Sequence, residues 1–319
     1  MNKLKTILPS WLAEILKKIR GLLRGTWPLQ IAQTNLAKSA SFESLTGKIR
    51  YKMAFDRNPI LATFADKKLV RNYVAEKVGD KYLSELIGIV SRGEDLRKIT
   101  LPSEFAIKSN NGSGAMILVS RTAPIENSLP AKPKKMNWEK YLVSLESFNL
   151  ESAINLIDVW MNQNYYYRTG HFPEWAYKEI QPVVVIEELM YDTSGRLPAD
   201  YKFFMIDGKC EFIQIDNSRY ETHTRDLFTP TWSRLEVRNV YPNNRAFIPK
   251  PKLLEEMLQV AEKLSSGIEF VRVDLYETSK GVKFGELTNY PGGGIEEYEP
   301  EEFGRNLGSH WKPNYSDVN

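Results

Sequence analysis

Two carboxylates near the C-terminus lie on segments that alternate apolar and polar residues, as strands do. Asp274 belongs to the run 270–277 and Glu286 to the run 281–288, with a turn at Lys280–Gly281 between them. Antiparallel pairing would place the two carboxylates side by side, where they repel unless a cation separates them. Because Mg²⁺ takes one or two carboxylates plus phosphate oxygens, the pair predicts a magnesium–nucleotide site. A surface cluster of salt bridges would give the same pattern.

Arg272 precedes Asp274 by two residues, so both side chains are expected on one face of the strand. A guanidinium there could stabilise charge on a phosphoryl group in transfer.

A lysine and a Gly-rich segment follow another apolar run. Lys108 follows directly after the run 105–107, and the segment after it contains Asn111, Gly112, Ser113 and Gly114. Lysine charge and backbone N–H groups suit phosphates, and glycine allows close approach. The segment is not a Walker loop, because no Gly-Lys-Ser/Thr precedes a helix, and the protein-kinase motifs are absent from the sequence. An ordinary hairpin turn remains the alternative.

The run 182–189 predicts a strand buried on both faces that ends in Glu187 and Glu188. The end of such a strand could hydrogen-bond adenine through its backbone and ribose through a carboxylate. It could equally be a strand that leaves the core.

These segments, taken in order, resemble the ATP-grasp superfamily. Within it, DYKFFMIDGK, DLYETSKGVKFGELTNYPGGG and EEFGRNLGSHW are similar to the TupA-like branch, and the resemblance covers about residues 45–311. It implies ATP and Mg²⁺ as cofactors and two α+β subdomains whose antiparallel sheets grip ATP. Lys67 and Lys108 would contact the phosphates, residues 110–114 would close over them, and Arg272 would act with Lys108 in catalysis. The implied adenine and ribose contacts are Glu187, Glu188, Leu189 and Met190, with Lys202 near nucleotide or substrate.

The metal ligands implied by the resemblance are Asp274 and Glu286, together with one further residue. Many ATP-grasp ligases have Glu-x-Asn, whereas here Thr288 stands at the asparagine position and Asn289 follows it. Neighbouring residues of a strand face opposite ways, so either Thr288 is a weaker ligand or Asn289 turns inward where the strand ends.

The resemblance implies an ATP-dependent carboxylate–amine ligase that makes an amide through an acyl phosphate. The TupA-like branch suggests a uronic acid or amino acid unit in cell-surface polysaccharide synthesis. The aromatic residues near Tyr165 and Trp175 suit sugar rings, although core packing would also explain them. A glycosyltransferase, an ATP-dependent kinase and a non-catalytic tethering protein remain alternatives, although the sequence has no Asp-x-Asp motif for the first.

The composition limits the partners and the compartment. A net charge of +3 over 319 residues gives no reason to expect nucleic acid, and the single cysteine, Cys210, fits a reducing cytoplasm. Residues 10–25 alternate apolar and basic side chains at helical spacing. This helix is expected either on the inner face of a membrane or packed against protein.

The fold class is predicted as α+β. The expected organisation is a helical region at 1–60, a helical segment at 61–100, one ATP-grasp subdomain at 101–190 and the other at 191–319. Within it we expect helices at 66–79, around 82–90 and across 138–164, and strand pairs at 105–120, 200–216 and 270–288.

Overall fold

Two sheets form the body of the protein, and the larger one carries the C-terminal hairpin. The structure is a computed structural model that describes residues 27–217, 223–244 and 246–313. The six-stranded sheet has the order β12-β11-β6-β7-β8-β9 and is antiparallel throughout. Its strands are β6 Asp200–Ile206, β7 Lys209–Asn217, β8 Thr224–Phe228, β9 Arg234–Leu235, β11 Phe270–Thr278 and β12 Gly281–Thr288.

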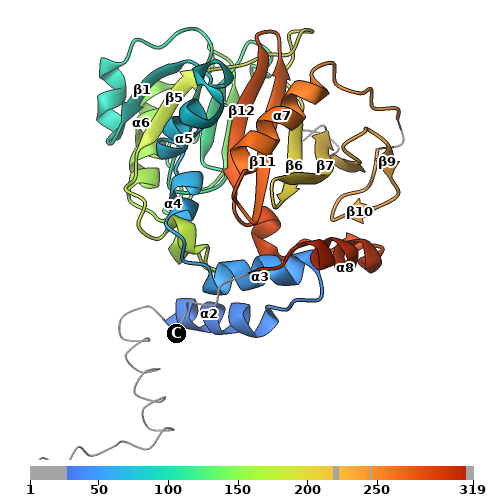
Figure 1. Ribbon diagram of the computed structural model, residues 1–319. Coiled ribbons are helices and arrows are strands. Elements are labelled where there is room, and N and C mark those ends of the chain that lie inside the picture. The colour runs from blue at the N-terminus through green and yellow to red at the C-terminus, as the bar shows by residue number, and fades with distance from the viewer. Residues whose placement is uncertain (1–26, 218–222, 245, 314–319) are drawn as a thin grey trace, which may run out of the picture.

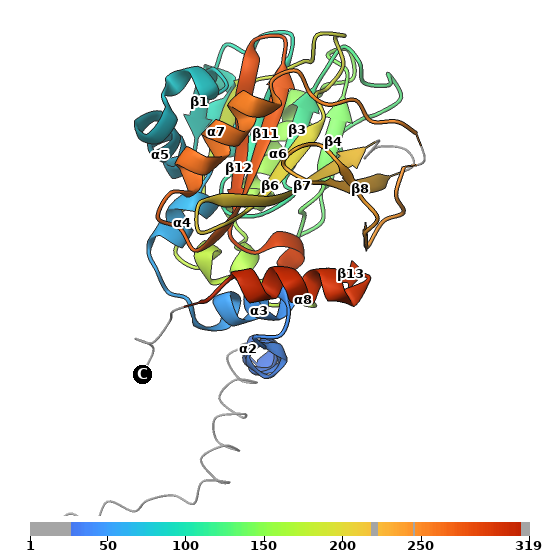
Figure 2. The ribbon, with the colours of Figure 1, turned by 45° about the vertical axis from the view of Figure 1, so that its right-hand side comes forward.

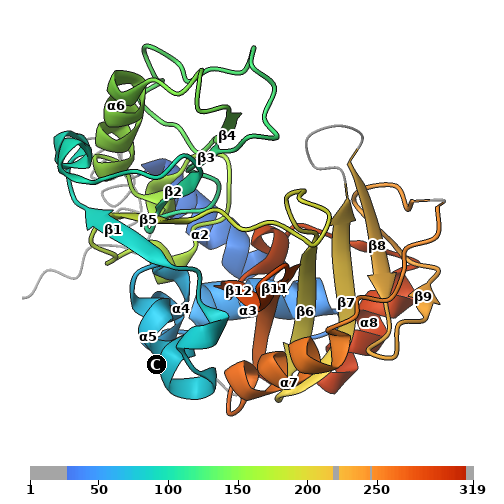
Figure 3. The ribbon, with the colours of Figure 1, turned by 90° about the horizontal axis from the view of Figure 1, so that it is seen from above.

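The smaller sheet has five strands in the order β1-β5-β2-β3-β4, with β3 and β4 parallel and the other pairs antiparallel. The strands are β1 Leu86–Val90, β2 Phe105–Ser109, β3 Met116–Val119, β4 Lys140–Val143 and β5 Val184–Glu188. Since β5 lies between β1 and β2, a nearly continuous apolar run fits it. Seen from above, the two sheets stand beside one another with helices on their outer sides (Figure 3).

Helices cover the outer face of each sheet. The helix α6 packs on the five-stranded sheet, and α7 and α5 pack on the six-stranded sheet. The opposite face of the larger sheet is covered at one end by α3 and α8, which lie side by side in two views (Figures 1 and 2). The helices are α2 Trp27–Ser39, α3 Leu45–Phe55, α4 Ile60–Ala65, α5 Leu69–Val78, α6 Leu150–Met161, α7 Leu254–Ser265 and α8 Glu301–His310.

Side-chain alternation divides each sheet into a core face and an inner face. In β11, Val271 and Val273 pack beneath α7, which leaves Arg272 on the other face. In β5, Val184 and Ile186 join the core beneath α6, while Val185 faces inward. The period of two along a strand thus turns the polar residues of both sheets toward a common space.

The α+β class and the predicted strand pairs are confirmed, but two expected helices are wrong. Residues 86–90 form the edge strand β1, since their backbone groups pair with β5. Residues 138–164 begin with strand β4, and the helix there starts only at Leu150, where Asn149 caps it. In both places pairing with a distant strand overrides the local helical pattern.

The remaining predictions about the chain's organisation are not decided by the fold. The helix expected at residues 10–25 lies outside the described residues, and the proposed subdomain boundaries stay a prediction. Within 27–217, 223–244 and 246–313, no helix has both the length and the apolar character to cross a membrane.

Trp311 offers a test of how the C-terminal segment is anchored. It is fully buried and stacks on Phe270 of β11, with ring centroids 4.6 Å apart. We expect Trp311→Ala to lower the free energy of unfolding by about 3–5 kcal/mol because it leaves a large cavity. Phe247→Ala is the control, since that ring is 88% exposed. It should change stability by less than about 0.5 kcal/mol in urea titration. Equal effects of the two variants would contradict this account.

Candidate active site

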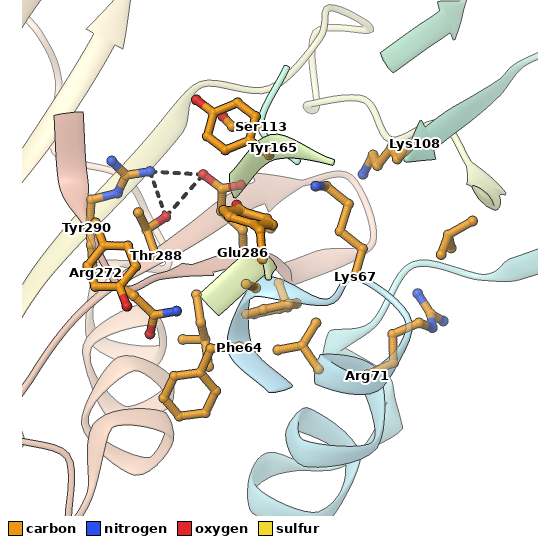
Figure 4. A pocket seen from close by; sticks show the side chains of 18 of the residues that line it. Phe64, Lys67, Arg71, Lys108, Ser113, Tyr165, Arg272, Glu286, Thr288 and Tyr290 are labelled. Atoms are coloured by element: carbon orange, nitrogen blue, oxygen red, sulfur yellow. Dashed lines mark hydrogen bonds and ion pairs between the residues drawn. The ribbon is translucent and has the colours of Figure 1, made fainter. Parts of the chain in front are cut away.

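A cavity of about 230 Å³ opens between the inner faces of the two sheets. Figure 4 shows Lys108 and Arg71 on one side of it and Arg272, Thr288 and Tyr290 on the opposite side. Its walls include Phe64, Lys67, Arg71, Ser84, Lys108, Ser113, Tyr165, Glu174, Tyr177, Val185, Glu187, Arg272, Glu286, Thr288, Asn289 and Tyr290.

Arg272 is held by side chains from its own strand and from β12. The pairing of β11 with β12 sets Asp274 opposite Glu286 and Arg272 opposite Thr288. The Arg272 Nη2 atom donates to Asp274 Oδ2 at 2.7 Å, to Glu286 Oε1 at 2.9 Å and to Thr288 Oγ1 at 3.0 Å. The two carboxylates are therefore neighbours, as predicted, and the cation between them is this guanidinium.

Lys202, on the neighbouring strand β6, is a second cation that contacts Asp274. Its Nζ lies 2.6 Å from Asp274 Oδ2 and 2.6 Å from Asp200 Oδ2, and it is 3% exposed. Burial raises the pKa of Asp274 to about 6, although Arg272 and Lys202 act against this. The oxygens of Asp274 accept hydrogen bonds from two cations, Arg272 and Lys202.

A β-bulge aims Glu286 at the cavity. The register of β11 and β12 shifts after the Asp274–Glu286 pair, where Gly285 is inserted. If the alternation continued regularly through Gly285, Glu286 would share the core face of Phe284. A Cβ on Gly285 would lie 2.8 Å from the ring of Tyr276, so this crowded position suits glycine.

Glu286 is the carboxylate most open to a ligand. Its side chain is 46% exposed, compared with 1% for Asp274. Burial alone would raise the pKa of Glu286, but Arg272, Lys202 and Lys67 outweigh it and hold that pKa well below the usual range. The group is therefore charged throughout the physiological range of pH.

The donor set fits Mg²⁺ only in combination with phosphate oxygens. Glu286 and Thr288 supply oxygen atoms at the cavity wall, whereas both Asp274 oxygens already accept hydrogen bonds from Arg272 or Lys202. In the described parts of the chain, no three His, Cys, Asp or Glu side chains form a metal-binding cluster. A site with few protein ligands is the ordinary arrangement for Mg²⁺ on a nucleotide.

Asn289 has a different position from Thr288. Its Nδ2 donates to the carbonyl of Leu61 at 2.8 Å, and its Oδ1 is buried without a hydrogen-bond partner among the described residues. Thr288 is the residue that joins Arg272 and Glu286, so it is the better candidate for the additional ligand.

Three cations from separate elements point into the cavity. Lys67, from the turn before α5, donates from Nζ to the carbonyl of Gly112 at 2.9 Å. Burial lowers the pKa of Lys67, and the charge of Glu286 partly offsets this. Lys108 forms an ion pair with Glu187, and Arg272 lies on the far side. Together they make the middle of the cavity suitable for a polyanion.

Glu187 is the centre of a polar cluster at one end of the cavity. Its Oε2 accepts from Ser84 Oγ at 2.6 Å and from Arg71 Nη1 at 3.1 Å. Burial would raise the pKa of Glu187, but Lys108 and these donors lower it. A ribose hydroxyl that bound here would have to share or replace one of these bonds.

The other predicted hinge residues lie outside the wall of this cavity. Glu188 pairs with Lys280, and both border an adjoining hollow of about 350 Å³ that also includes Arg71 and Ser84. Leu189 and Met190 are half-buried and line neither space. Their proposed contacts with adenine remain predictions.

The Gly-rich segment is shaped by protein packing as well as by any ligand. A Cβ on Gly112 would lie 2.1 Å from the Trp138 ring, and one on Gly114 would lie 2.3 Å from the Trp138 carbonyl. Asn111 is fully buried and donates to the carbonyls of Trp160 and Gln163. Of the predicted loop residues, Ser113 is the one whose side chain lines the cavity.

Several residues of the cavity were not predicted from the sequence. Arg71 and Ser84 are the partners of Glu187, and Glu174, Tyr177 and Tyr290 line the same cavity. Arg71 lies four residues after Lys67, a helical spacing that could have placed it on the same side. The other four lie in loops or short 3₁₀ turns, for which the sequence has no periodic signal.

Comparison with solved structures gives weak, distant likenesses to ATP-grasp ligases. D-alanine–D-alanine ligase from Bacillus anthracis is 13% identical with a TM-score of 0.39, covering 81% of this chain and 66% of that one. The enzyme from Helicobacter pylori is 15% identical with a TM-score of 0.35, covering 73% and 53%. The ligase PsnB, complexed with a phosphomimetic variant of its minimal precursor, Mg and ADP, is 10% identical with a TM-score of 0.37, covering 88% and 63%. The chain spans between about half and two thirds of these proteins, and no curated protein matches its sequence.

The family comparison is decisive because it covers most of the chain. The sequence model described as TupA-like ATPgrasp matches residues 43–312, which include both sheets and every cavity residue named above. The match confirms the predicted family and, with it, the prediction that the protein is an ATP-grasp enzyme. The chain belongs to the TupA-like ATP-grasp family.

Proposed function

We propose that the protein is an ATP-dependent ligase that joins a carboxylate to an amine through an acyl phosphate. The observation that supports this most directly is the cavity between the sheets. Lys67, Lys108 and Arg272 converge there, and Glu286 lies beside Arg272. Such a site suits a triphosphate bound between a polar ribose end and a reactive end. We propose the subdomains 101–190 and 191–319 as the two halves that hold it.

In the first step, a carboxylate oxygen of the substrate attacks the γ-phosphorus of ATP and the bond to the β–γ bridging oxygen breaks. Charge accumulates on the transferred oxygens, and Arg272 and Lys67 are the cations available to offset it. Bound Mg²⁺ would neutralise phosphate charge, held by Glu286 with Thr288 beside it. Asp274 would fix Arg272 in place through its two hydrogen bonds.

In the second step, an amine attacks the acyl carbon and phosphate leaves. Because water would compete for the acyl phosphate, the cavity must be closed during this step. Lys67 already contacts the carbonyl of Gly112, so residues 110–114 are suited to covering the site.

The family suggests a uronic acid or amino acid unit of a cell-surface polysaccharide as a substrate. Synthesis at the cytoplasmic side of the membrane, with residues 10–25 as a peripheral anchor, is part of the same proposal. A glycosyltransferase, a kinase on this fold and a non-catalytic tether are the competing functions. The first would use a nucleotide sugar, the second would leave the γ-phosphate on a stable product, and the third would tolerate loss of Asp274 and Glu286.

The proposal is tested by incubating the full chain with ATP, Mg²⁺ and uronic-acid glycosides crossed with the amino acids. Phosphate release and mass spectrometry are measured in the same samples. We expect release of phosphate with one carboxylate–amine combination and a product lighter than the summed substrates by one water. Phosphate retained on a stable product would favour a kinase, and no ATP binding would overturn the proposal.

The two carboxylates of the site should respond differently to neutralisation. Glu286→Gln should leave stability nearly unchanged, since the side chain is 46% exposed, and should reduce ATP turnover by roughly 10²–10³-fold. Asp274→Asn, in contrast, should lower the free energy of unfolding by about 3 kcal/mol or more, because Lys202 and Arg272 are buried against this carboxylate.

Thermal unfolding and ATP turnover, measured on the same preparations, separate these effects. Normal turnover by Glu286→Gln would remove this residue from the proposed mechanism. An unfolding midpoint of Asp274→Asn equal to that of the wild type would contradict the structural role given to Asp274.

A further inference from the structure

One part of the cavity wall has no role in the first step of the reaction. This part consists of Tyr165, Glu174, Tyr177 and Tyr290. Tyr165 and Tyr177 belong to or adjoin short 3₁₀ turns and contact one another, with ring centroids 5.1 Å apart. We refer to these four residues as the tyrosine chamber.

The tyrosine chamber shares the cavity with the proposed phosphoryl-transfer residues, and its Tyr290 lies on the side opposite Lys108 and Arg71 (Figure 4). Tyr165, Glu174 and Tyr177 line the same cavity as Glu286. Tyr290 follows Thr288 by two residues at the end of β12. A substrate in the chamber would therefore approach the acyl phosphate from the side opposite Lys108 and Arg71.

Glu174 is the distinctive group of this chamber. It is half-buried in the cavity wall, and its carboxylate accepts no hydrogen bond and forms no ion pair within the described parts of the chain. Its backbone carbonyl accepts from Tyr177 N at 3.1 Å, which fixes the position of the residue. A half-buried carboxylate that faces a cavity without a partner can be stabilised by a cationic ligand.

A bound cation would favour the ionised form of Glu174, which burial alone disfavours. Burial raises its pKa to about 8, Arg168 lowers it and Glu286 raises it further. Arg168 is already engaged by Tyr165, to whose hydroxyl it donates at 2.6 Å. The other charged groups that act on the chamber's tyrosines are Asp56 and Arg57, near Tyr290.

We propose that the tyrosine chamber binds the amine substrate as an ammonium ion, with Glu174 as its counter-ion and as the acceptor of its proton. This rests on the proposed ligase function and adds the charge and class of the second substrate. Aromatic faces and a carboxylate together are a favourable environment for an ammonium group. The acceptor is accordingly a primary amine that is protonated in solution, such as an amino acid or an amino sugar.

In the second step, the amine nitrogen loses two protons. The ammonium transfers one proton to the Glu174 carboxylate and becomes a neutral amine. Its nitrogen lone pair forms the C–N bond, while the bond from the acyl carbon to the phosphate oxygen breaks and its electrons go to phosphate. The second proton of the nitrogen leaves with phosphate as hydrogen phosphate. Glu174 releases its proton to solvent once the products have left.

The test compares Glu174→Gln with Glu179→Gln in the full chain. Glu179 lies five residues further on, its side chain is 75% exposed and it pairs with Lys178, so its substitution makes the same change of charge outside the cavity. The carboxylate panel is offered with ATP, Mg²⁺ and one of two acceptors. One acceptor is hydroxylamine, which is small and mostly uncharged at neutral pH and traps acyl phosphates as hydroxamates. The other is the amino acid panel.

We expect Glu174→Gln to form hydroxamate at close to the wild-type rate, because acyl phosphate formation does not need Glu174. Amide formation with amino acids should fall by about 100-fold or more, with a higher KM for the amine and an unchanged KM for ATP. Glu179→Gln should behave as the wild type in both assays. Hydroxamate formation also shows that the variant is folded.

Two outcomes would overturn the inference alone. One is an equal loss of hydroxamate and amide in Glu174→Gln, which would give Glu174 a role in folding or in the first step. The other is normal amide formation by that variant. Failure of the wild type to form hydroxamate with any carboxylate would instead overturn the ligase function, and the inference with it.

Discussion

The guanidinium of Arg272 joins two neighbouring strands at the point where the sheet faces the cavity. It donates to Asp274 on its own strand and to Glu286 and Thr288 on β12. Two carboxylates on adjacent strands would otherwise repel each other. With Arg272 between them they form an anionic edge beside a buried cation, and the proposed reactive end of the cavity depends on this arrangement.

The cavity therefore combines groups whose charges would be unfavourable if they were separated. Lys202 stabilises Asp274 from β6, and Glu187 is compensated by Lys108 and Arg71 from the other sheet. Burial makes each of these ions costly unless it is paired. A triphosphate with its magnesium would add charge of both signs to a site that is nearly balanced, so ligand binding must rearrange existing ion pairs. Glu286, half-exposed and strongly acidic, is the group most free to do so.

Features that depend on neighbouring residues were predictable from the sequence, whereas features that depend on distant contacts were not. The strand pair that carries Asp274 and Glu286 was predictable because alternation and a short turn fix antiparallel pairing. Their shared orientation toward the cavity was not predictable. It depends on the bulge at Gly285, which interrupts the alternation and fits the limited space beside Tyr276. Residues 86–90 were expected as a helix because their strand character comes from pairing with β5, far away in the sequence. Glu174 gave no signal because its place in the cavity wall depends on tertiary structure alone.

The glycines of residues 110–114 have a consequence for motion. Gly112 and Gly114 press against the ring and backbone of Trp138, whose indole N–H is buried without a hydrogen-bond partner among the described residues. The segment proposed to cover the phosphates therefore cannot move as an independent flap, because it packs against the indole. A large movement of residues 110–114 would displace Trp138 as well. The natural fluorescence of this tryptophan is consequently an optical reporter of such a movement.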